Sequence, residues 1–233
     1  MKSFEKRFVS HNVELAYRIY DPESDYRGKN MLLFGGGGWR SMSIEQLSCF
    51  ADEFVKCGVR CFIPEYRVSS KHDTTAKDSF DDCCNFWEYL SDQKTFRSDE
   101  QIFLCGASAG GTLALLLSKY LGNKGVKVQN IFLFNPVVDL FTLRGFEKEL
   151  NFAERKQFSP MECYEQKCGM EIFHGDCDTL VPISDIYKFQ KKLQSKGINC
   201  HVNVFEGKTH GFFNKQRDKE TFEEICKEIC KKL

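Results

Sequence analysis

The chain has 233 residues, enough for one domain of ordinary to large size with a substantial buried core. Lys and Arg together number 33, Asp and Glu also number 33, and 42% of the residues are hydrophobic, as in ordinary globular proteins. Balanced charge without a basic cluster argues against nucleic-acid binding, and no apolar run approaches the ~20 residues that cross a bilayer. We therefore expect neither a nucleic-acid partner nor a membrane partner.

Twelve cysteines form an even set that could pair as disulfides. Disulfide scaffolds are usually shorter chains, and Cys61 and Cys105 stand in apolar, strand-like runs where a free cysteine acts as a small hydrophobic residue. Cys226 and Cys230 share one face of a predicted helix, but no Cys-x-x-Cys or zinc-spaced histidine pair accompanies them. We expect free thiols, no metal and a reducing, cytoplasmic location. The first residues also lack the apolar segment of a secretory signal.

Strand-like and helix-like segments alternate along the chain. Short apolar runs predict strands, and apolar residues at helical spacing predict helices. The predicted strands cover residues 13–20, 31–34, 59–63, 102–105, 128–134, 171–174 and 200–205. The predicted helices cover residues 44–56, 73–90, 109–121, 184–195 and 220–233. This alternation predicts an α/β fold with a mostly parallel central sheet and helices on both faces. We expect a single domain over residues 1–233, with the less regular segment 137–168 as a small lid or cap insertion.

The strongest motif places a serine between a predicted strand and a predicted helix. It reads Gly106-Ala-Ser108-Ala-Gly110 and directly follows the apolar run 102–105. Glycines two residues to either side leave room for a sharp turn, and the N-terminus of the following helix favours negative charge. The motif predicts Ser108 as a nucleophile. The alternative is a capping serine at the start of a glycine-rich helix.

A serine nucleophile needs a base, and the base needs a carboxylate that orients it. Among five histidines, His210 stands beside a glycine in the loop after the last predicted strand, where it can face a cleft. Asp178 follows the predicted strand 171–174 and is the favoured carboxylate. The alternative, Asp176, can instead shape the turn through its own backbone bonds.

A run of four glycines, 35–38, follows the early predicted strand 31–34. Backbone N–H groups of Gly37 and Gly38, together with that of Ala109, are predicted to form an oxyanion hole. Losing one such donor typically costs on the order of 10²–10³ in rate. A phosphate-binding loop is the alternative, but the Gly-Lys-Ser/Thr that it requires is absent.

Together these motifs resemble the α/β-hydrolase esterases, in particular hormone-sensitive-lipase-like enzymes and bacterial acetyl, feruloyl and xylan esterases. The resemblance covers nearly the whole chain from about residue 12. Gly35 stands where that group often has a histidine, and Glu65 stands where its Asp-Tyr-Arg motif has aspartate. Further matching segments are Pro64–Arg67, Ser159-Pro160, His174–Pro182 and His210-Gly-Phe.

The resemblance implies a serine hydrolase with a triad of Ser108, Asp178 and His210, in the chain order that this fold uses. It also implies a structural role for Arg67. The sequence shows no cofactor motif, and the expected chemistry requires no cofactor. The expected substrate is a small-molecule or carbohydrate ester with a short acyl group, including O-acetyl groups on sugars. Trp39 and Phe212 are expected to contact it, with core packing as the alternative for Phe212.

Two other functions share these motifs. An amidase of the kynurenine formamidase type has the same glycine-Trp loop and triad. A non-catalytic binding protein on this fold would usually have lost a triad member, and all three are present here. The sequence leaves the oligomeric state open, with a homodimer as one alternative.

Overall fold

The computed structural model describes residues 2–23, 25–143 and 152–233. The predicted lid or cap at 137–168 is therefore described only in part, because residues 144–151 lie outside these ranges.

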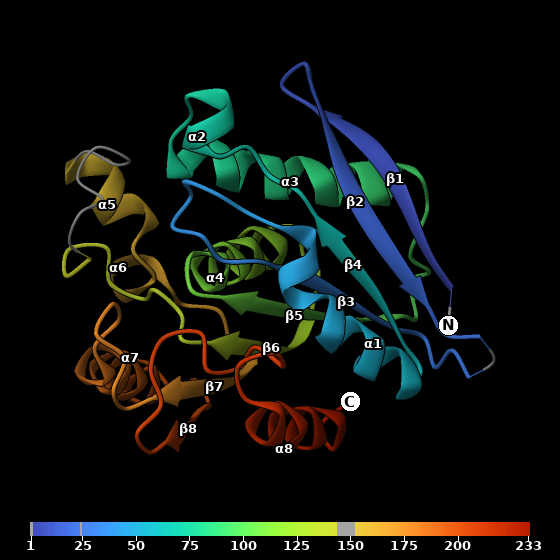
Figure 1. The fold of residues 1–233 in the computed structure, drawn as a ribbon. Helices are drawn as coiled ribbons and strands as arrows, with labels where there is room; N and C mark the ends of the chain where they lie inside the picture. The colour runs from blue at the N-terminus through green and yellow to red at the C-terminus, as the bar shows by residue number, and fades with distance from the viewer. Residues whose placement is uncertain (1, 24, 144–151) are drawn as a thin grey trace.

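The described residues form a central sheet of eight strands in the order β1-β2-β4-β3-β5-β6-β7-β8 (Figure 1). β2 pairs antiparallel with both β1 and β4, and all other neighbours are parallel. The strands are β1 (Lys2–Ser10), β2 (Val13–Asp21), β3 (Lys29–Phe34), β4 (Val59–Pro64), β5 (Gln101–Ala107), β6 (Val128–Phe134), β7 (Gly169–Gly175) and β8 (Cys200–Phe205). The predicted mostly parallel sheet is confirmed.

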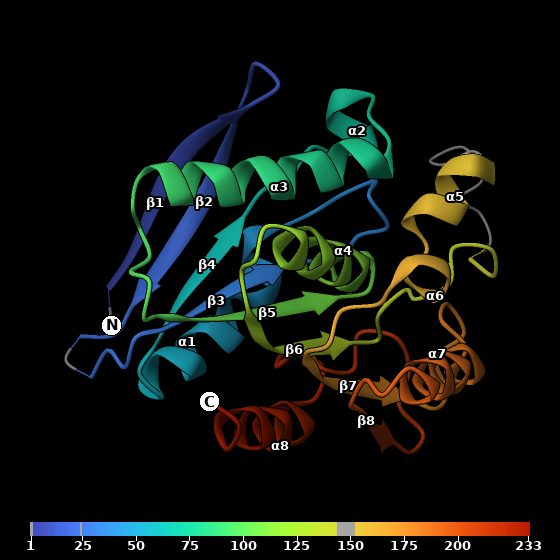
Figure 2. The same cartoon turned by 180° about the vertical axis from the view of Figure 1, so that it is seen from behind.

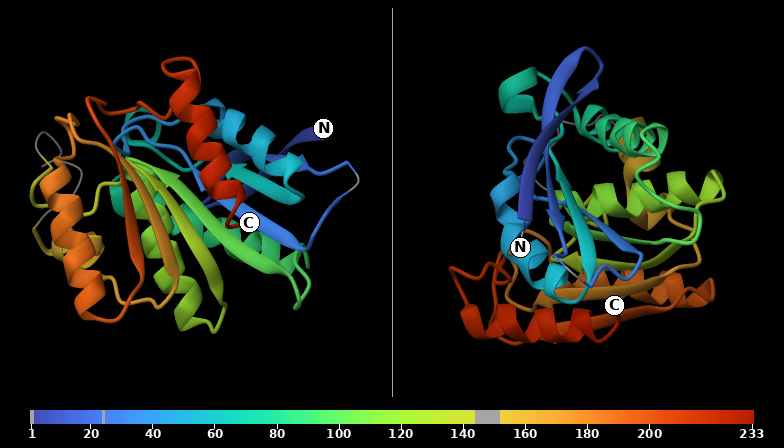
Figure 3. Two further views of the ribbon diagram at one scale, coloured as in Figure 1. Left: turned by 90° about the horizontal axis from the view of Figure 1, so that it is seen from below. Right: turned by 90° about the vertical axis from the view of Figure 1, so that its right-hand side faces the viewer.

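Helices cover both faces of this sheet, as predicted. α3, α4 and α7 lie on one face, while α1 and α8 lie on the other (Figures 2 and 3). The helices are the 3-10 helix η1 (Ile44–Leu47) and α1 (Ser48–Lys56), α2 (Ser69–His72), α3 (Ala76–Asp92), α4 (Ala109–Asn123), α5 (Phe152–Phe158), α6 (Pro160–Cys163), α7 (Ile183–Ser195) and α8 (Lys219–Cys230).

The two faces explain the short, fully apolar strands. Successive side chains of a strand point to opposite faces. In β3, Leu32 and Phe34 pack into the core beneath α3 and α4, while Met31 and Leu33 pack into the core beneath α1 and α8. When helices cover both faces of a strand, all its side chains are buried, so apolar residues do not alternate with polar ones.

β1 was not predicted from the sequence. Its residues are exposed except at Phe8 and Ser10, and it pairs only with β2 at the edge of the sheet. Phe8 packs edge-on to Tyr17 and close to Phe86 of α3. An edge strand with one buried apolar side chain shows no alternating pattern in the sequence.

α3 begins later than the predicted residue 73. Thr75 and Asp78 form a capping box, in which Asp78 accepts hydrogen bonds from the backbone N–H and hydroxyl of Thr75. Asp73 has a left-handed φ of 52° and ends the short helix α2. The polar residues at 73–75 thus separate two helices.

All twelve cysteines are free thiols in the structure. No helix among the described residues is both long and apolar enough to cross a membrane.

Candidate active site

Ser108 stands at a sharp turn between β5 and α4, at the carboxyl end of the sheet. Its backbone has φ 52° and ψ −119°, a strained conformation for a non-glycine residue. The turn is tight: a Cβ added at Gly106 would lie closer than 3.0 Å to the carbonyl of Gly110, and one added at Gly110 would lie as close to the carbonyl of Phe34. The flanking glycines are thus required by the close approach of the backbone.

His210 lies between Ser108 and Asp178. Its Nε2 is 3.0 Å from Ser108 Oγ, and its Nδ1 is 2.7 Å from Asp178 Oδ2. With Nδ1–H directed at the carboxylate, Nε2 can accept the proton of the serine hydroxyl. The fold thus joins three side chains, from the loops after β5, β7 and β8, into one hydrogen-bonded chain.

Asp178 is 5% exposed and accepts several hydrogen bonds. Oδ1 accepts from the backbone N–H groups of Leu180 and Val181, and Oδ2 accepts from His210 and from the side-chain amide of Asn135. Burial alone would raise the pKa of Asp178, but the hydrogen bonds from His210, Val181 and Asn135 outweigh burial and hold the pKa below 3.8. The carboxylate is therefore ionised at neutral pH.

The other candidates have structural positions. Asp176 Oδ1 accepts the backbone N–H of Gly207 at 2.7 Å, which ties together the loops after β7 and β8. His174 is fully buried, and its Nε2 is 2.9 Å from the carbonyl of Val181. Burial lowers the pKa of His174, so the ring is neutral and braces the loop that carries Asp178.

The glycine loop after β3 is held by two side chains that the motifs did not assign to it. Tyr66 donates its hydroxyl to the carbonyl of Gly35 at 2.6 Å. Gln46 Oε1 accepts the backbone N–H of Gly36. These two hydrogen bonds hold the backbone of Gly35 and Gly36, at the start of the loop, in place.

Gly37 and Gly38 line a pocket together with Ser108, and Ala109 is the first residue of α4. Within the described ranges, no protein acceptor forms a hydrogen bond with the backbone N–H of Gly37, Gly38 or Ala109. Their placement suits donation to a substrate oxygen beside Ser108, and their oxyanion role stays a prediction.

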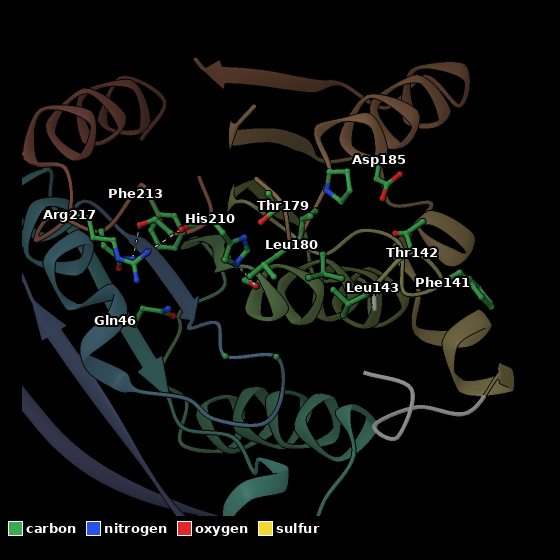
Figure 4. Close-up of a pocket in the computed structure, with 18 residues that line it drawn as sticks. Gln46, Phe141, Thr142, Leu143, Thr179, Leu180, Asp185, His210, Phe213 and Arg217 are labelled. Carbon is green, nitrogen blue, oxygen red and sulfur yellow. Dashed lines mark hydrogen bonds between the residues drawn. The ribbon is translucent and has the colours of Figure 1, made fainter. Parts of the chain in front are cut away.

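The pocket has a volume of about 790 Å³ and two unlike ends (Figure 4). Phe141 and Leu143 lie at one end, and Gln46 and Arg217 lie at the other, with His210 between them.

The structure contradicts the expected substrate contacts of Trp39 and Phe212. Trp39 is 1% exposed and Phe212 is 4% exposed, and neither lines the pocket. Gly38 and Trp39 both have positive φ, and the chain turns so that the indole packs into the core. Phe212 packs against Phe205, with ring centroids 4.9 Å apart, while its neighbour Phe213 lines the pocket.

Arg67 has the structural role that the resemblance implied. Its Nε lies 2.9 Å from Asp82 Oδ2, and both side chains are buried. Ser79 donates its hydroxyl to the carbonyl of Arg67. The ion pair between Arg67 and Asp82 links α3 to the chain after β4, away from the pocket.

Several residues of the site were not predicted. Tyr66 lies within the Pro64–Arg67 motif, and Asn135 directly follows the predicted strand 128–134, but no role was predicted for either. Gln46 and Arg217 could not be predicted as site residues, because no motif near them in the sequence indicates a pocket.

Residues 31–168, more than half of the chain, match a family described as the alpha/beta hydrolase fold. The chain belongs to the alpha/beta hydrolase family. Residues 127–231 of this alpha/beta hydrolase also match the prolyl oligopeptidase family. The family indicated by the motifs is thereby confirmed.

Among curated proteins, this alpha/beta hydrolase is 28% identical over 198 residues to Esterase LipU of Mycobacterium tuberculosis. The match covers 72% of this chain but 63% of that protein, so the chain spans less than two thirds of its relative's length.

Solved structures of Thermogutta terrifontis esterase 2 are also similar. The form phosphoramylated by tabun has a TM-score of 0.85 and 27% identity, covering 97% of this chain and 92% of that one. The propionate-bound form has a TM-score of 0.81 and 27% identity, covering 96% and 91%.

Proposed function

We propose that this alpha/beta hydrolase is a serine carboxylesterase that cleaves small esters with short acyl groups through an acyl-enzyme intermediate. The observation that carries the proposal is the hydrogen-bonded chain of Ser108, His210 and Asp178 beside an open pocket. Support comes from the relatives, because Esterase LipU and esterase 2 are both named as esterases.

The reaction follows from the geometry. Ser108 Oγ attacks the ester carbonyl while His210 Nε2 takes its proton. The negative oxygen is held by backbone N–H groups of Gly37, Gly38 and Ala109. His210 then gives its proton to the departing alcohol. Water hydrolyses the acyl-serine with His210 again as the base, and Asp178 stays ionised throughout.

The pocket supports a short acyl group. About 790 Å³ suits a small molecule, and the Phe141 and Leu143 end offers apolar surface for a few methylene groups. Esterase 2 has been solved in propionate-bound and butyrate-bound forms. O-acetyl groups on carbohydrates fall within this class and are the narrower substrate that the resemblance implies. The esterase relatives favour an ester over the formamide alternative.

Ser108→Ala tests the proposal. We expect wild type to hydrolyse p-nitrophenyl acetate and butyrate faster than the octanoate, and Ser108→Ala to lose at least about 10³-fold in kcat, because no other nucleophile replaces the hydroxyl. Ser91→Ala, an exposed serine at the end of α3, is the matched control. Equal turnover by Ser108→Ala would contradict the assignment, and an inactive wild type would favour the non-catalytic alternative.

A further inference from the structure

Arg217 lines the polar end of the pocket, in the turn between the His210 loop and α8. Its Nη1 donates to the carbonyl of His210 at 3.1 Å. Figure 4 shows the guanidinium near His210 and on the same side of the pocket as Gln46. The side chain is thus held beside the catalytic histidine.

The charge of Arg217 has no partner within the described part of the chain. Arginine is charged at all ordinary pH values. No described carboxylate forms an ion pair with Arg217, whereas Asp218 next to it pairs with Lys208 at 2.5 Å. Gln46 and Asn214, the pocket residues nearest in the polar end, are neutral amides.

Gly211 lies against the guanidinium. This residue has φ 79°, and a Cβ there would lie 2.9 Å from Arg217 Nη1 and 3.2 Å from Asn214 Nδ2. Asn214 Nδ2 in turn donates to the carbonyl of Gly211 at 2.8 Å. The guanidinium thus packs against the loop backbone at Gly211, a position whose positive φ favours glycine.

None of the described residues that line the opposite end of the pocket is Arg or Lys. Asp185, which lines that end, is buried and pairs with Lys188 at 3.1 Å. Figure 4 places Asp185 far from Arg217, beside Thr142 and Phe141. Among the described lining residues, the one cation therefore lies at one end of the pocket, and the acidic and neutral side chains of Asp185, Thr142 and Phe141 lie at the other.

The geometry points to an anion-binding subsite at Arg217, so that the preferred substrates are esters carrying a second group that is a carboxylate. This inference rests on the proposed esterase function and deepens it. A guanidinium binds a carboxylate through paired N–H donors, and the unpaired charge beside His210 is placed to do so when the substrate lies across Ser108. The carboxylate can belong to the acyl part or to the alcohol part of the ester.

Two isosteric pairs of esters test the inference and distinguish these sources. Mono-p-nitrophenyl glutarate replaces the terminal methyl of p-nitrophenyl pentanoate by a carboxylate on the acyl side. 4-Acetoxybenzoate replaces the methyl of 4-methylphenyl acetate by a carboxylate on the alcohol side. The readout is the ratio of kcat/KM for the anionic ester to that for its neutral partner, because loss of the Arg217–His210 bond affects both esters of a pair alike.

We expect Arg217→Ala to lower this ratio about 3- to 10-fold for one of the two pairs, the effect of a charged hydrogen bond in a partly solvated site. The pair of esters whose ratio falls shows whether the bound carboxylate belongs to the acyl part or to the alcohol part. Arg217→Lys should keep part of the ratio, and added salt should lower it in wild type but not in Arg217→Ala.

Lys215→Ala is the matched control. Lys215 belongs to the same turn but lies over the ring of Phe222 and does not line the pocket. The inference is overturned if both ratios in Arg217→Ala equal those of wild type, or if Lys215→Ala lowers them as much. Wild type that cleaves none of the four esters would instead refute the esterase proposal itself.

Discussion

Asn135 lies directly after β6 and donates its side-chain amide to Asp178 Oδ2. Its backbone has φ 42°, a left-handed conformation that asparagine tolerates better than most residues. Its own N–H donates to the carbonyl of Phe173 in β7. The residue thus joins two neighbouring strand ends and fixes the carboxylate that orients His210.

Asn135→Gly removes the amide and keeps a residue that adopts positive φ freely. We expect kcat to fall about 10-fold with little change in KM, because one charged hydrogen bond is worth about 1.5–3 kcal/mol and Asp178 then orients the imidazole less well. Steady-state kinetics on p-nitrophenyl acetate measures kcat and KM separately. Asn135→Asp, which places a like charge beside Asp178, should be more severe. An unchanged kcat in both variants would show that Asn135 only shapes the turn.

The same variant has a pH signature. Asp178 has a lowered pKa in the folded protein, so its contribution to stability is present above its ordinary pKa of 3.8 and is lost as pH falls through the folded value. Without the Asn135 hydrogen bond the pKa lies closer to 3.8. Asn135→Gly should therefore lose less free energy of unfolding than wild type on acidification through that range.

α4 illustrates how one helix combines two kinds of glycine. Gly110, in its first turn, approaches the backbone carbonyls of Phe34 and Gly35, which cannot move without displacing β3 and the glycine loop. Gly122, in its last turn, faces only the end of the flexible Gln166 side chain. Close backbone approach at Gly110 is what lets β5, α4 and the glycine loop meet at Ser108.

Substituting alanine at these two glycines should give opposite results. Alanine favours a helix interior by about 1 kcal/mol over glycine, so propensity alone predicts stabilisation at both sites. We expect Gly110→Ala instead to lower the free energy of unfolding by about 1–3 kcal/mol through overpacking, and Gly122→Ala to be neutral or stabilising. Urea unfolding followed by circular dichroism measures both. Destabilisation of equal size at the two sites would contradict the steric argument.

At the scale of the whole molecule, the sheet separates two hydrophobic cores. α3, α4 and α7 enclose one and α1 and α8 the other, and every interior strand contributes to both. The segments that match the two families overlap over residues 127–168, so neither match marks a boundary between independent parts. These features favour the single domain predicted from the sequence.

We therefore expect one cooperative unfolding transition. Trp39 and Trp87, the two tryptophans, lie in the core beneath α3 and α4, so their fluorescence reports on that core. Far-UV circular dichroism reports on all helices, including α1 and α8. The two signals should change at the same denaturant concentration, together with loss of esterase activity. Two separated transitions would show that the cores unfold independently.

The sequence by itself determined the alternation of strands and helices, the two-sided sheet, and the positions of Ser108, Asp178 and His210 in loops after strands. These follow from local patterns: apolar runs, glycines at a tight turn, and polar residues at strand ends. The edge strand β1 was missed because only Phe8 among its apolar residues is buried, which leaves no periodicity to detect.

Only the tertiary structure decided which side chains surround those three residues. Trp39 and Phe212 pack inward and leave the pocket to Phe213, because the direction of a loop side chain depends on the turn and on neighbours distant in sequence. Asn135 and Arg217 reach the site through contacts between separate strand ends and loops. Long-range contacts of this kind have no local signature, so a sequence read along its length does not reveal them.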